Sequence, residues 1–217
     1  MSNPIKFVIT SDTHGFHSVT SIPKCDFLIY CGDYSQEGNE KSSRSFAKWL
    51  SNQKATHKII VMGNHERRIA SELPESKRWI LDECPDCHFL INESVVIDDF
   101  FFYGSSYHFV EPENFEIPEN KKFILVTHEP PYNILDEMVV KQTQIPWKYF
   151  RGGNGNLNSF IEKYPPHLHC FGHCHHCYGS MRNGNTLHIN ASRVTEILIP
   201  WNKPWVVTFE NNEFIYH

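Results

Sequence analysis

Short apolar runs that end at polar residues recur along the chain, and such runs predict buried strands. They occur at Ile5–Ser11, Cys25–Asp33 and His57–Asn64. The segment Ser42–Gln53 lies between the last two and has its large apolar residues on one helical face, so it predicts an amphipathic helix. This order of strand, strand, helix and strand indicates a layered α/β fold with a sheet that is at least partly parallel.

The later part of the chain is richer in predicted strands. Three short strands with polar turns are predicted within His88–Ser106, and Asn211–Asn212 is typical of a hairpin turn. The other predicted elements are a helix at Asn156–Tyr164 and strands at Lys121–Pro131, His167–His173, Asn185–Ser192 and Pro204–His217. The chain contains no internal repeat, low-complexity tract or long linker, so residues 1–217 are expected to form one domain.

Polar side chains with metal-binding atoms follow five of these predicted strands. They are Asp12, His14, Asp33, Asn64, His65, His128, His173 and His175. In an open α/β sheet, ligands bind in the crevice outside the carboxyl ends of the strands. We therefore expect these side chains to meet at one place.

The donor types indicate which metals they would bind. Leaving His65 aside, the set holds two aspartates, one asparagine and four histidines, and no thiolate. This mixture favours Mn, Fe, Zn or Ni and is too rich in nitrogen for Mg or Ca. Seven donors exceed one tetrahedral site but suit two ions that share a carboxylate, and Asp33 is the expected bridge.

The same residues occur in motifs that resemble a known family. Asp-Thr-His, Gly-Asp, Gly-Asn-His-Glu, Thr-His and Gly-His-Cys-His stand in the order of the five blocks of calcineurin-like metallophosphoesterases. The segments THEPPYNILD, FGHCHHCYG and INAS resemble more narrowly the small metallophosphoesterase-domain-containing proteins related to class III cyclic-nucleotide phosphodiesterases. The segment FYGSSYHF departs from that group, in which Pro and Trp would follow Gly-Ser.

The resemblance implies a fold and a distribution of metal ligands. The fold would be a four-layer α/β/β/α sandwich with two mixed β-sheets. One ion would be bound by Asp12, His14, His175 and the bridging Asp33, and the other by Asp33, Asn64, His128 and His173. His65 would stand outside both ions and act as the catalytic histidine, facing the leaving group of the substrate.

The function implied is hydrolysis of phosphodiesters or small phosphomonoesters by attack of a metal-bridging hydroxide, with manganese the favoured metal. The partner would then be a phosphate ester, with nucleotides among the candidates. A protein Ser/Thr phosphatase, a nuclease and a non-catalytic binding scaffold remain as alternatives. The formal charge of −5 and the lack of a basic tract give no strong nucleic-acid signal. The oligomeric state stays open.

The number of cysteines and the N-terminal segment indicate the cellular compartment of the protein. The seven cysteines are odd in number, and the first predicted strand begins within five residues without a secretory pattern. Both observations favour reduced thiols and a cytoplasmic protein. No apolar run approaches the roughly 20 residues of a membrane span, so we expect no membrane partner.

Several other residues are weaker candidates. Cys84, Cys87, Cys174 and Cys177 leave a four-cysteine zinc site open, although its halves lie 90 residues apart against about 15–20 in common zinc sites. Cys174 is expected to point away from the metals if His173 and His175 lie on an extended segment. The candidate pocket or phosphate contacts are Arg67, Arg68, Tyr107, His108, Arg151 and Arg193.

Overall fold

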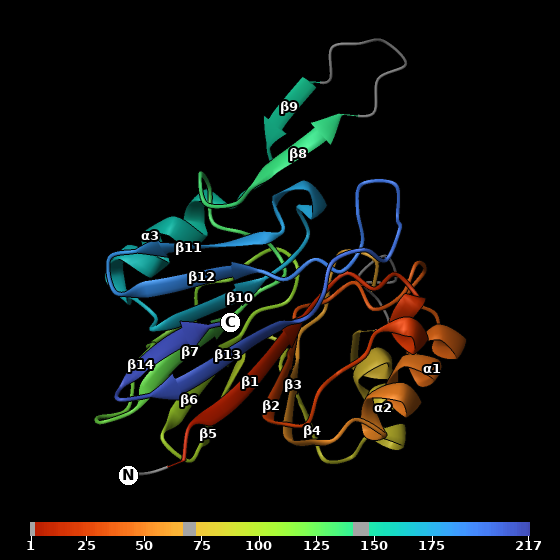
Figure 1. Cartoon of the computed structure of the whole chain (residues 1–217), viewed down its shortest axis with the longest axis horizontal. Helices are drawn as coiled ribbons and strands as arrows, with labels where there is room; N and C mark the ends of the chain where they lie inside the picture. Colours follow the sequence, from red (N-terminus) through yellow and green to blue (C-terminus); the bar gives the residue numbers. More distant parts are fainter. Residues whose placement is uncertain (1–2, 67–72, 141–147) are drawn as a thin grey trace.

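The first of two six-stranded sheets is built around parallel strands from the N-terminal part of the chain. A computed structural model describes residues 3–66, 73–140 and 148–217 (Figure 1). The parallel strands are β1 (Ile5–Thr10), β2 (Cys25–Tyr30), β3 (Ala55–Ile60) and β4 (Cys87–Phe89). Antiparallel strands β13 (Trp205–Glu210) and β14 (Glu213–Tyr216) extend the sheet beyond β1, in the order β14-β13-β1-β2-β3-β4. The predicted hairpin turn is confirmed at Asn211 and Asn212, whose φ values are 49° and 70°.

The second sheet is also mixed, with the order β11-β12-β10-β7-β6-β5. Its four inner strands are parallel, and β5 and β11 pair antiparallel at the two edges. The strands are β5 (Glu93–Ile97), β6 (Phe100–Gly104), β7 (Lys122–Val126), β10 (Leu168–Phe171), β11 (Gly179–Asn183) and β12 (Thr186–Asn190). A separate two-stranded ribbon, β8 (Glu137–Val140) and β9 (Lys148–Arg151), projects from one end of the molecule (Figure 1).

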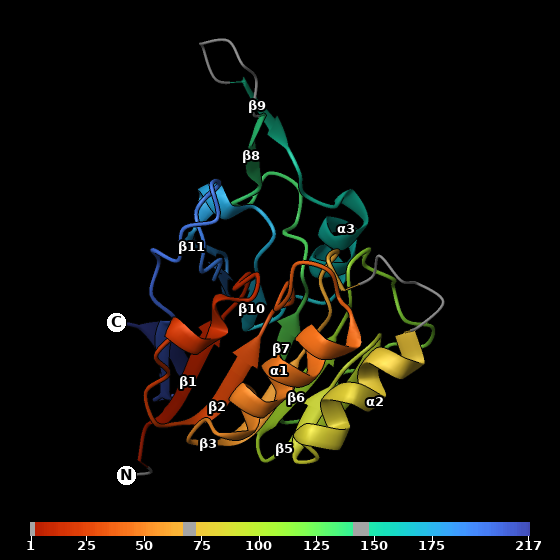
Figure 2. The same ribbon diagram turned by 90° about the vertical axis from the view of Figure 1, so that its right-hand side faces the viewer.

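Helices cover the outer face of each sheet. Helices α1 (Glu40–Ser51) and α2 (Leu73–Glu83) lie on the first sheet, as Figure 2 shows, and α3 (Gly155–Lys163) lies on the second. The described part of the chain also contains two short 3-10 helices, η1 (Phe16–Val19) and η3 (His175–Cys177). The expected four-layer α/β/β/α sandwich with two mixed sheets is therefore confirmed.

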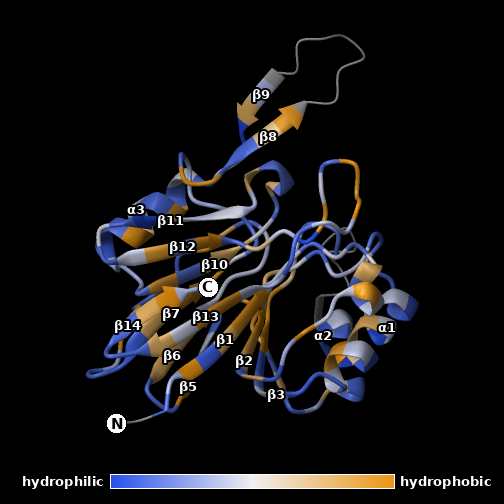
Figure 3. Ribbon diagram, in the orientation of Figure 1, coloured by the Kyte–Doolittle hydropathy of each residue, from blue (hydrophilic) through white to orange (hydrophobic). Residues whose placement is uncertain are grey.

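The space between the sheets is filled by apolar side chains. Figure 3 shows apolar residues concentrated on the inner strands, with polar residues over the helices and turns. Phe7 on β1 is fully buried; its ring stacks on Phe27 at 4.7 Å and meets the edges of Phe100 at 5.1 Å and Phe214 at 5.4 Å. These contacts join strands of both sheets and fix the position of one sheet relative to the other.

Some elements differ from the sequence-based expectation. Helix α2 and strands β8, β9 and β11 were not predicted. Three strands do occur between Cys87 and Gly104, but β4 pairs with β3 in the first sheet, whereas β5 and β6 belong to the second. The chain changes sheets near Asn92, which has a φ of 56°. A local apolar pattern predicts a strand but cannot state which sheet it joins. Within the described residues, no helix is both long and apolar enough to cross a membrane.

The Phe7 cluster generates a stability prediction. Phe7→Ala would leave a cavity between the sheets, so the free energy of unfolding should fall by about 3–5 kcal/mol. Val19→Ala is the matched control, because Val19 is 62% exposed and surface substitutions change stability by about 0.5 kcal/mol or less. Urea unfolding followed by circular dichroism measures both. Equal losses for the two variants would contradict the role of Phe7.

Candidate metal centre

The eight predicted site residues lie together where strands from both sheets end. They follow β1, β2 and β3 of the first sheet and β7 and β10 of the second. The site therefore lies where the two sheets meet. The backbone N–H of Ser11 donates to the carbonyl of Ala191 at 3.0 Å, which joins the end of β1 to the segment after β12. This contact places the loops that follow strands of the first sheet next to those that follow strands of the second sheet.

The carboxylate of Asp33 lies at the middle of this group. Its Oδ2 is 3.4 Å from His128 Nε2, 3.7 Å from His14 Nε2 and 3.9 Å from His65 Nε2. Its other oxygen, Oδ1, accepts a hydrogen bond from the backbone N–H of His65 at 2.9 Å. One carboxylate oxygen thus faces three imidazoles, while the other is held by the backbone.

Further donors lie on both sides of Asp33. On one side, His14 Nε2 and His175 Nε2 are 3.2 Å apart, and His175 Nε2 is 3.4 Å from Oδ1 of Asp12. On the other side, the side-chain oxygen of Asn64 is 3.0 Å from His128 Nε2 and 3.0 Å from Nδ1 of His173. Three groups of three residues bring metal-binding atoms within 4.8 Å of one another: Asp12–His14–His175, His14–Asp33–His65 and Asp12–Asp33–His128.

These spacings fit residues that hold metal ions. Metal–ligand bonds of about 2.0–2.2 Å place adjacent ligand atoms about 3–3.5 Å apart. The contacts between His14 and His175 and around Asn64 lie at 3.0–3.2 Å. In addition, His14 Nδ1 is buried and has no hydrogen-bond partner among the residues that the structure describes, which leaves the ring without a fixed tautomer. The residues present therefore fit two ions of the class that prefers mixed nitrogen and oxygen donors.

Backbone carbonyls orient two of the imidazoles. Nδ1 of His128 donates to the carbonyl of Cys31 at 2.7 Å, and Nδ1 of His175 donates to that of Thr195 at 3.3 Å. When Nδ1 carries the proton, Nε2 of a neutral ring presents a lone pair. Both Nε2 atoms point toward the aspartates, so these rings are oriented as metal ligands commonly are.

His65 is placed differently from the other histidines. Its Nδ1 donates to the carbonyl of Gln36 at 2.8 Å, and its side chain is 19% exposed, compared with 2% for His14. The His65 and His14 rings meet edge to face with centroids 4.6 Å apart. His65 therefore lies at the solvent side of the cluster, within reach of a bound molecule.

Charges within the site keep both carboxylates ionised. Burial raises the pKa of Asp12 and of Asp33, because a buried charge loses hydration. For Asp12 the hydrogen bond and charge of His175 outweigh burial, and for Asp33 the charge and hydrogen bond of His128 do so. The pKa of each carboxyl therefore ends below its ordinary value, and both are available as anionic ligands.

The imidazoles divide into neutral and protonated rings. Burial lowers the pKa of His14 and of His173 to about 4, so both are neutral at pH 7 and can bind metal. Burial also lowers the pKa of His128, but the Asp33 carboxylate raises it to about 10. A proton thus occupies the His128–Asp33 pair in the metal-free protein, and metal binding there displaces it.

Four of the predicted residues have left-handed backbone conformations. Asp12, His14, Asp33 and His173 have φ values of 52°, 43°, 55° and 67°. Non-glycine residues adopt this region rarely, and Asp and His do so more readily than most. Gly172 makes room for the site, since a Cβ there would stand 2.0 Å from Oδ2 of Asp12. The backbone is strained where it aims the ligand side chains.

Glu66 is a supporting residue to which the sequence assigned no role. One of its oxygens accepts from the backbone N–H groups of Asp33 at 2.8 Å and Gly63 at 3.0 Å. The other accepts from both the N–H and the hydroxyl of Ser35 at 3.0 Å. Burial and the Asp33 charge outweigh these N–H groups and raise the pKa of Glu66 to about 8. Glu66 belongs to the Gly-Asn-His-Glu motif, but only the fold shows that it binds the Asp33 loop.

Tyr107 and His108, two of the weaker pocket candidates, lie in different positions relative to the site. The Tyr107 ring lies 5.4 Å from that of His173 and therefore reaches the site. His108 is directed elsewhere, with its Nδ1 3.5 Å from Glu129 and a side chain that is 63% exposed.

The arginine candidates do not form a phosphate clamp in the described residues. Arg151 on β9 pairs with Asp136 at 2.6 Å. Arg193 has Nε and Nη1 buried without hydrogen-bond partners, but it is absent from the cavity over the metal centre. Arg67 and Arg68 lie outside the described residues.

The four-cysteine zinc site is excluded by the fold. Cys84 and Cys87 pack in the core between the first sheet and its helices. Cys177 instead accepts from the backbone N–H of Glu137 on β8, and Cys174 is fully buried beside it in the chain. All seven cysteines are free. The expected extended segment was also wrong, because the chain turns at His173 and forms η3 from His175 to Cys177.

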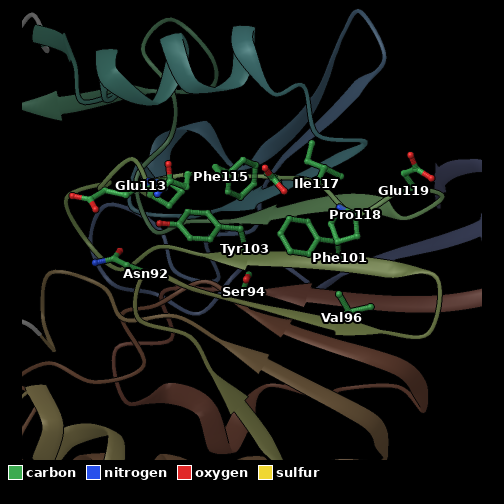
Figure 4. A pocket seen from close by; sticks show the side chains of 13 residues that line it. Asn92, Ser94, Val96, Phe101, Tyr103, Glu113, Phe115, Ile117, Pro118 and Glu119 are labelled. Carbon is green, nitrogen blue, oxygen red and sulfur yellow. The ribbon is translucent and has the colours of Figure 1, made fainter.

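A cavity of about 420 Å³ opens over the metal centre. Its lining residues are His14, Asp33, Asn64, His65, Met138, Val139, His173, His175, Glu196 and Leu198. A cavity of about 650 Å³ lies elsewhere, between β5, β6 and residues 112–119, as Figure 4 shows. It contains none of the eight predicted residues.

Known proteins share this sequence pattern and fold. The profile of the calcineurin-like phosphoesterase family matches residues 5–177. Human metallophosphoesterase domain-containing protein 1 is 28% identical, over 93% of this chain and 70% of its own. The protein TT1561 of Thermus thermophilus has a TM-score of 0.61 at 10% identity, with 99% of each chain covered. A structure described as a novel archaeal phosphodiesterase has a TM-score of 0.55 at 17% identity, covering 98% of this chain and 99% of its own.

The profile match spans well over half of the chain. The chain therefore belongs to the calcineurin-like phosphoesterase family. Hydrolysis of phosphate esters and the binding of metal ions are properties of this family, and the candidate ligand groups lie where the strands converge.

Glu66 generates a testable prediction about the site. Glu66→Gln would turn an amide NH₂ toward backbone N–H groups, so the free energy of unfolding should fall by about 1–3 kcal/mol. Affinity for Mn²⁺ should fall about 10–100-fold, because the Asp33 loop loses its support. Urea unfolding and calorimetric Mn²⁺ titration measure the two effects. The exposed Glu213→Gln variant should match the wild type in both; unchanged Mn²⁺ affinity in Glu66→Gln would contradict the supporting role.

Proposed function

We propose that this chain is a dinuclear metal-dependent phosphoesterase that hydrolyses phosphodiesters or small phosphomonoesters. The observation that carries the proposal is the position of Asp33 Oδ2, which faces His128 at 3.4 Å and His14 at 3.7 Å. These histidines belong to the two different donor groups. A carboxylate between two such groups is suited to bridge two ions.

The proposed ligands follow from this division. Asp12, His14 and His175 would hold one ion, and Asn64, His128 and His173 the other, with Asp33 shared. Two ions bound there would supply Lewis-acid activation of water and charge neutralisation at the phosphoryl group. Manganese is our preferred metal for the first tests, because the donors combine imidazole nitrogen with carboxylate and amide oxygen.

His65 is the proposed catalytic histidine. The Gln36 carbonyl holds Nδ1–H, so Nε2 faces the cavity, where it lies 3.9 Å from Asp33. A protonated Nε2 can donate to the departing alkoxide of the substrate, which is general acid catalysis. The seven other residues position the phosphate, and His65 acts on the bond that breaks.

A non-catalytic scaffold is the alternative from another class. It would be favoured by loss of a donor or of the histidine that faces the leaving group. Here all eight residues are present. Six of them line one cavity, and the buried Asp12 and His128 contact cavity residues His175 and Asp33. This completeness supports the enzymatic proposal over the scaffold.

Removal of His65 tests the catalytic assignment. His65→Ala should lower kcat for bis(p-nitrophenyl) phosphate by about 10²–10⁴-fold, while the bound manganese, measured by elemental analysis, stays at the wild-type level. The exposed His217→Ala variant should change neither quantity. A fall in metal content as large as the fall in rate would show that His65 is a ligand instead.

Removal of the metals tests the proposal itself. Chelation should abolish turnover, and Mn²⁺ should restore it. Asp33→Asn keeps the shape of the side chain but removes the charge that both ions would share, so it should lose both ions together. Elemental analysis and turnover are measured on the same samples. Full turnover after complete chelation would refute metal dependence, and loss of one ion alone would refute the bridging role.

A further inference from the structure

A loop between β12 and β13 forms one wall of the cavity over the metal centre. Figure 1 shows this segment rising at the same end of the molecule as β8 and β9. The loop is tightened by a bridge between Val194 and Pro200, and the N–H of Leu198 donates to the carbonyl of Thr195 at 2.8 Å. The same carbonyl accepts from Nδ1 of His175, so the position of the loop is linked to a proposed ligand.

The loop places one carboxylate beside the proposed metal ligands. Glu196 lines the same cavity as His14, Asp33 and His175, and its Oε1 is buried without a hydrogen-bond partner among the described residues. Its charge reaches the site: burial lowers the pKa of His175, whereas Asp12 and then Glu196 raise it. A buried carboxylate oxygen without a partner is costly, so its position calls for an explanation.

We propose that Glu196 determines specificity by disfavouring doubly charged phosphomonoesters relative to singly charged phosphodiesters. The inference rests on the proposed function, since it names the class of ester that the same site prefers. Glu196 would not be a metal ligand, and it would act on the substrate through its charge.

The reason is the difference in negative charge between phosphomonoesters and phosphodiesters. A phosphomonoester has a second pKa of about 6 and carries nearly two negative charges above pH 7, whereas a diester carries one. Each added substrate charge is repelled by Glu196. The apolar side chains of Met138, Val139 and Leu198 line the same cavity and exclude water from part of it. Repulsion between charges is less screened in such surroundings than in bulk water.

The test compares one diester with one monoester on manganese-loaded protein at pH 8. Glu196→Gln removes the charge but keeps an amide oxygen. The ratio of kcat/KM for p-nitrophenyl phosphate to that for bis(p-nitrophenyl) phosphate should rise about tenfold, the size expected for one charge at several ångströms in a partly wet cavity. Glu196→Ala should raise the ratio similarly, because it removes the same charge. The exposed Glu213→Gln control should leave it unchanged.

A binding measurement provides a readout that does not need turnover. Inorganic phosphate is mainly dianionic at pH 8, so calorimetry should show about tenfold tighter phosphate binding to Glu196→Gln than to the wild type. Mn²⁺ affinity should be the same in both proteins. Loss of Mn²⁺ binding in Glu196→Gln would show that Glu196 is a ligand and would overturn the proposal.

The two proposals fail in different ways. If the wild type turns over both esters but Glu196→Gln leaves the ratio and the phosphate affinity unchanged, the specificity role is wrong and the phosphoesterase proposal stands. If no ester is hydrolysed but phosphate binds more tightly to Glu196→Gln, the electrostatic role of Glu196 stands and the catalytic proposal fails.

Discussion

The Asp33 carboxylate has to stay ionised while it is buried, and much of the surrounding structure serves that requirement. An unpaired buried charge is costly, so the interior must supply compensating groups. Imidazoles surround one oxygen of Asp33, and the backbone N–H of His65 holds the other. Glu66 in turn accepts from the N–H of Asp33 itself. The Asp33 charge and burial raise the pKa of Glu66 to about 8, so the ionised Asp33 does not face a second full negative charge at neutral pH.

The sandwich supplies a rigid edge for this arrangement. Parallel strands from both sheets point their carboxyl ends the same way, and the aromatic cluster around Phe7 fixes one sheet on the other. The ligand loops are short extensions of these strands, so small backbone adjustments decide where the donors point. The left-handed residues Asp12 and Asp33 are such adjustments, and the packed scaffold maintains their strain.

The walls and the floor of the cavity over the metal centre are formed by different parts of the chain. The floor is formed by residues of the family motifs, which follow the inner strands of both sheets. The walls come from β8, through Met138 and Val139, and from the loop that carries Glu196 and Leu198. Under the two proposals, chemistry and specificity would be carried by separate parts of the chain, as is common when a family scaffold supports several substrates.

The sequence by itself determined the layered α/β class and most inner strands, and it named eight candidate residues that the fold brings together, because these depend on local patterns and on motif order. It did not determine helix α2, the ribbon β8–β9 or the assignment of β4 and β5 to different sheets, since a short apolar run carries no information about its pairing partner. The supporting contacts were also decided only by the tertiary structure. The carbonyls of Cys31 and Thr195 that orient His128 and His175 carry no side-chain signal, and Glu196 lies far in sequence from most of the residues it faces. Motifs show which atoms can bind a metal, whereas pairing, tautomer and cavity walls depend on contacts between distant segments.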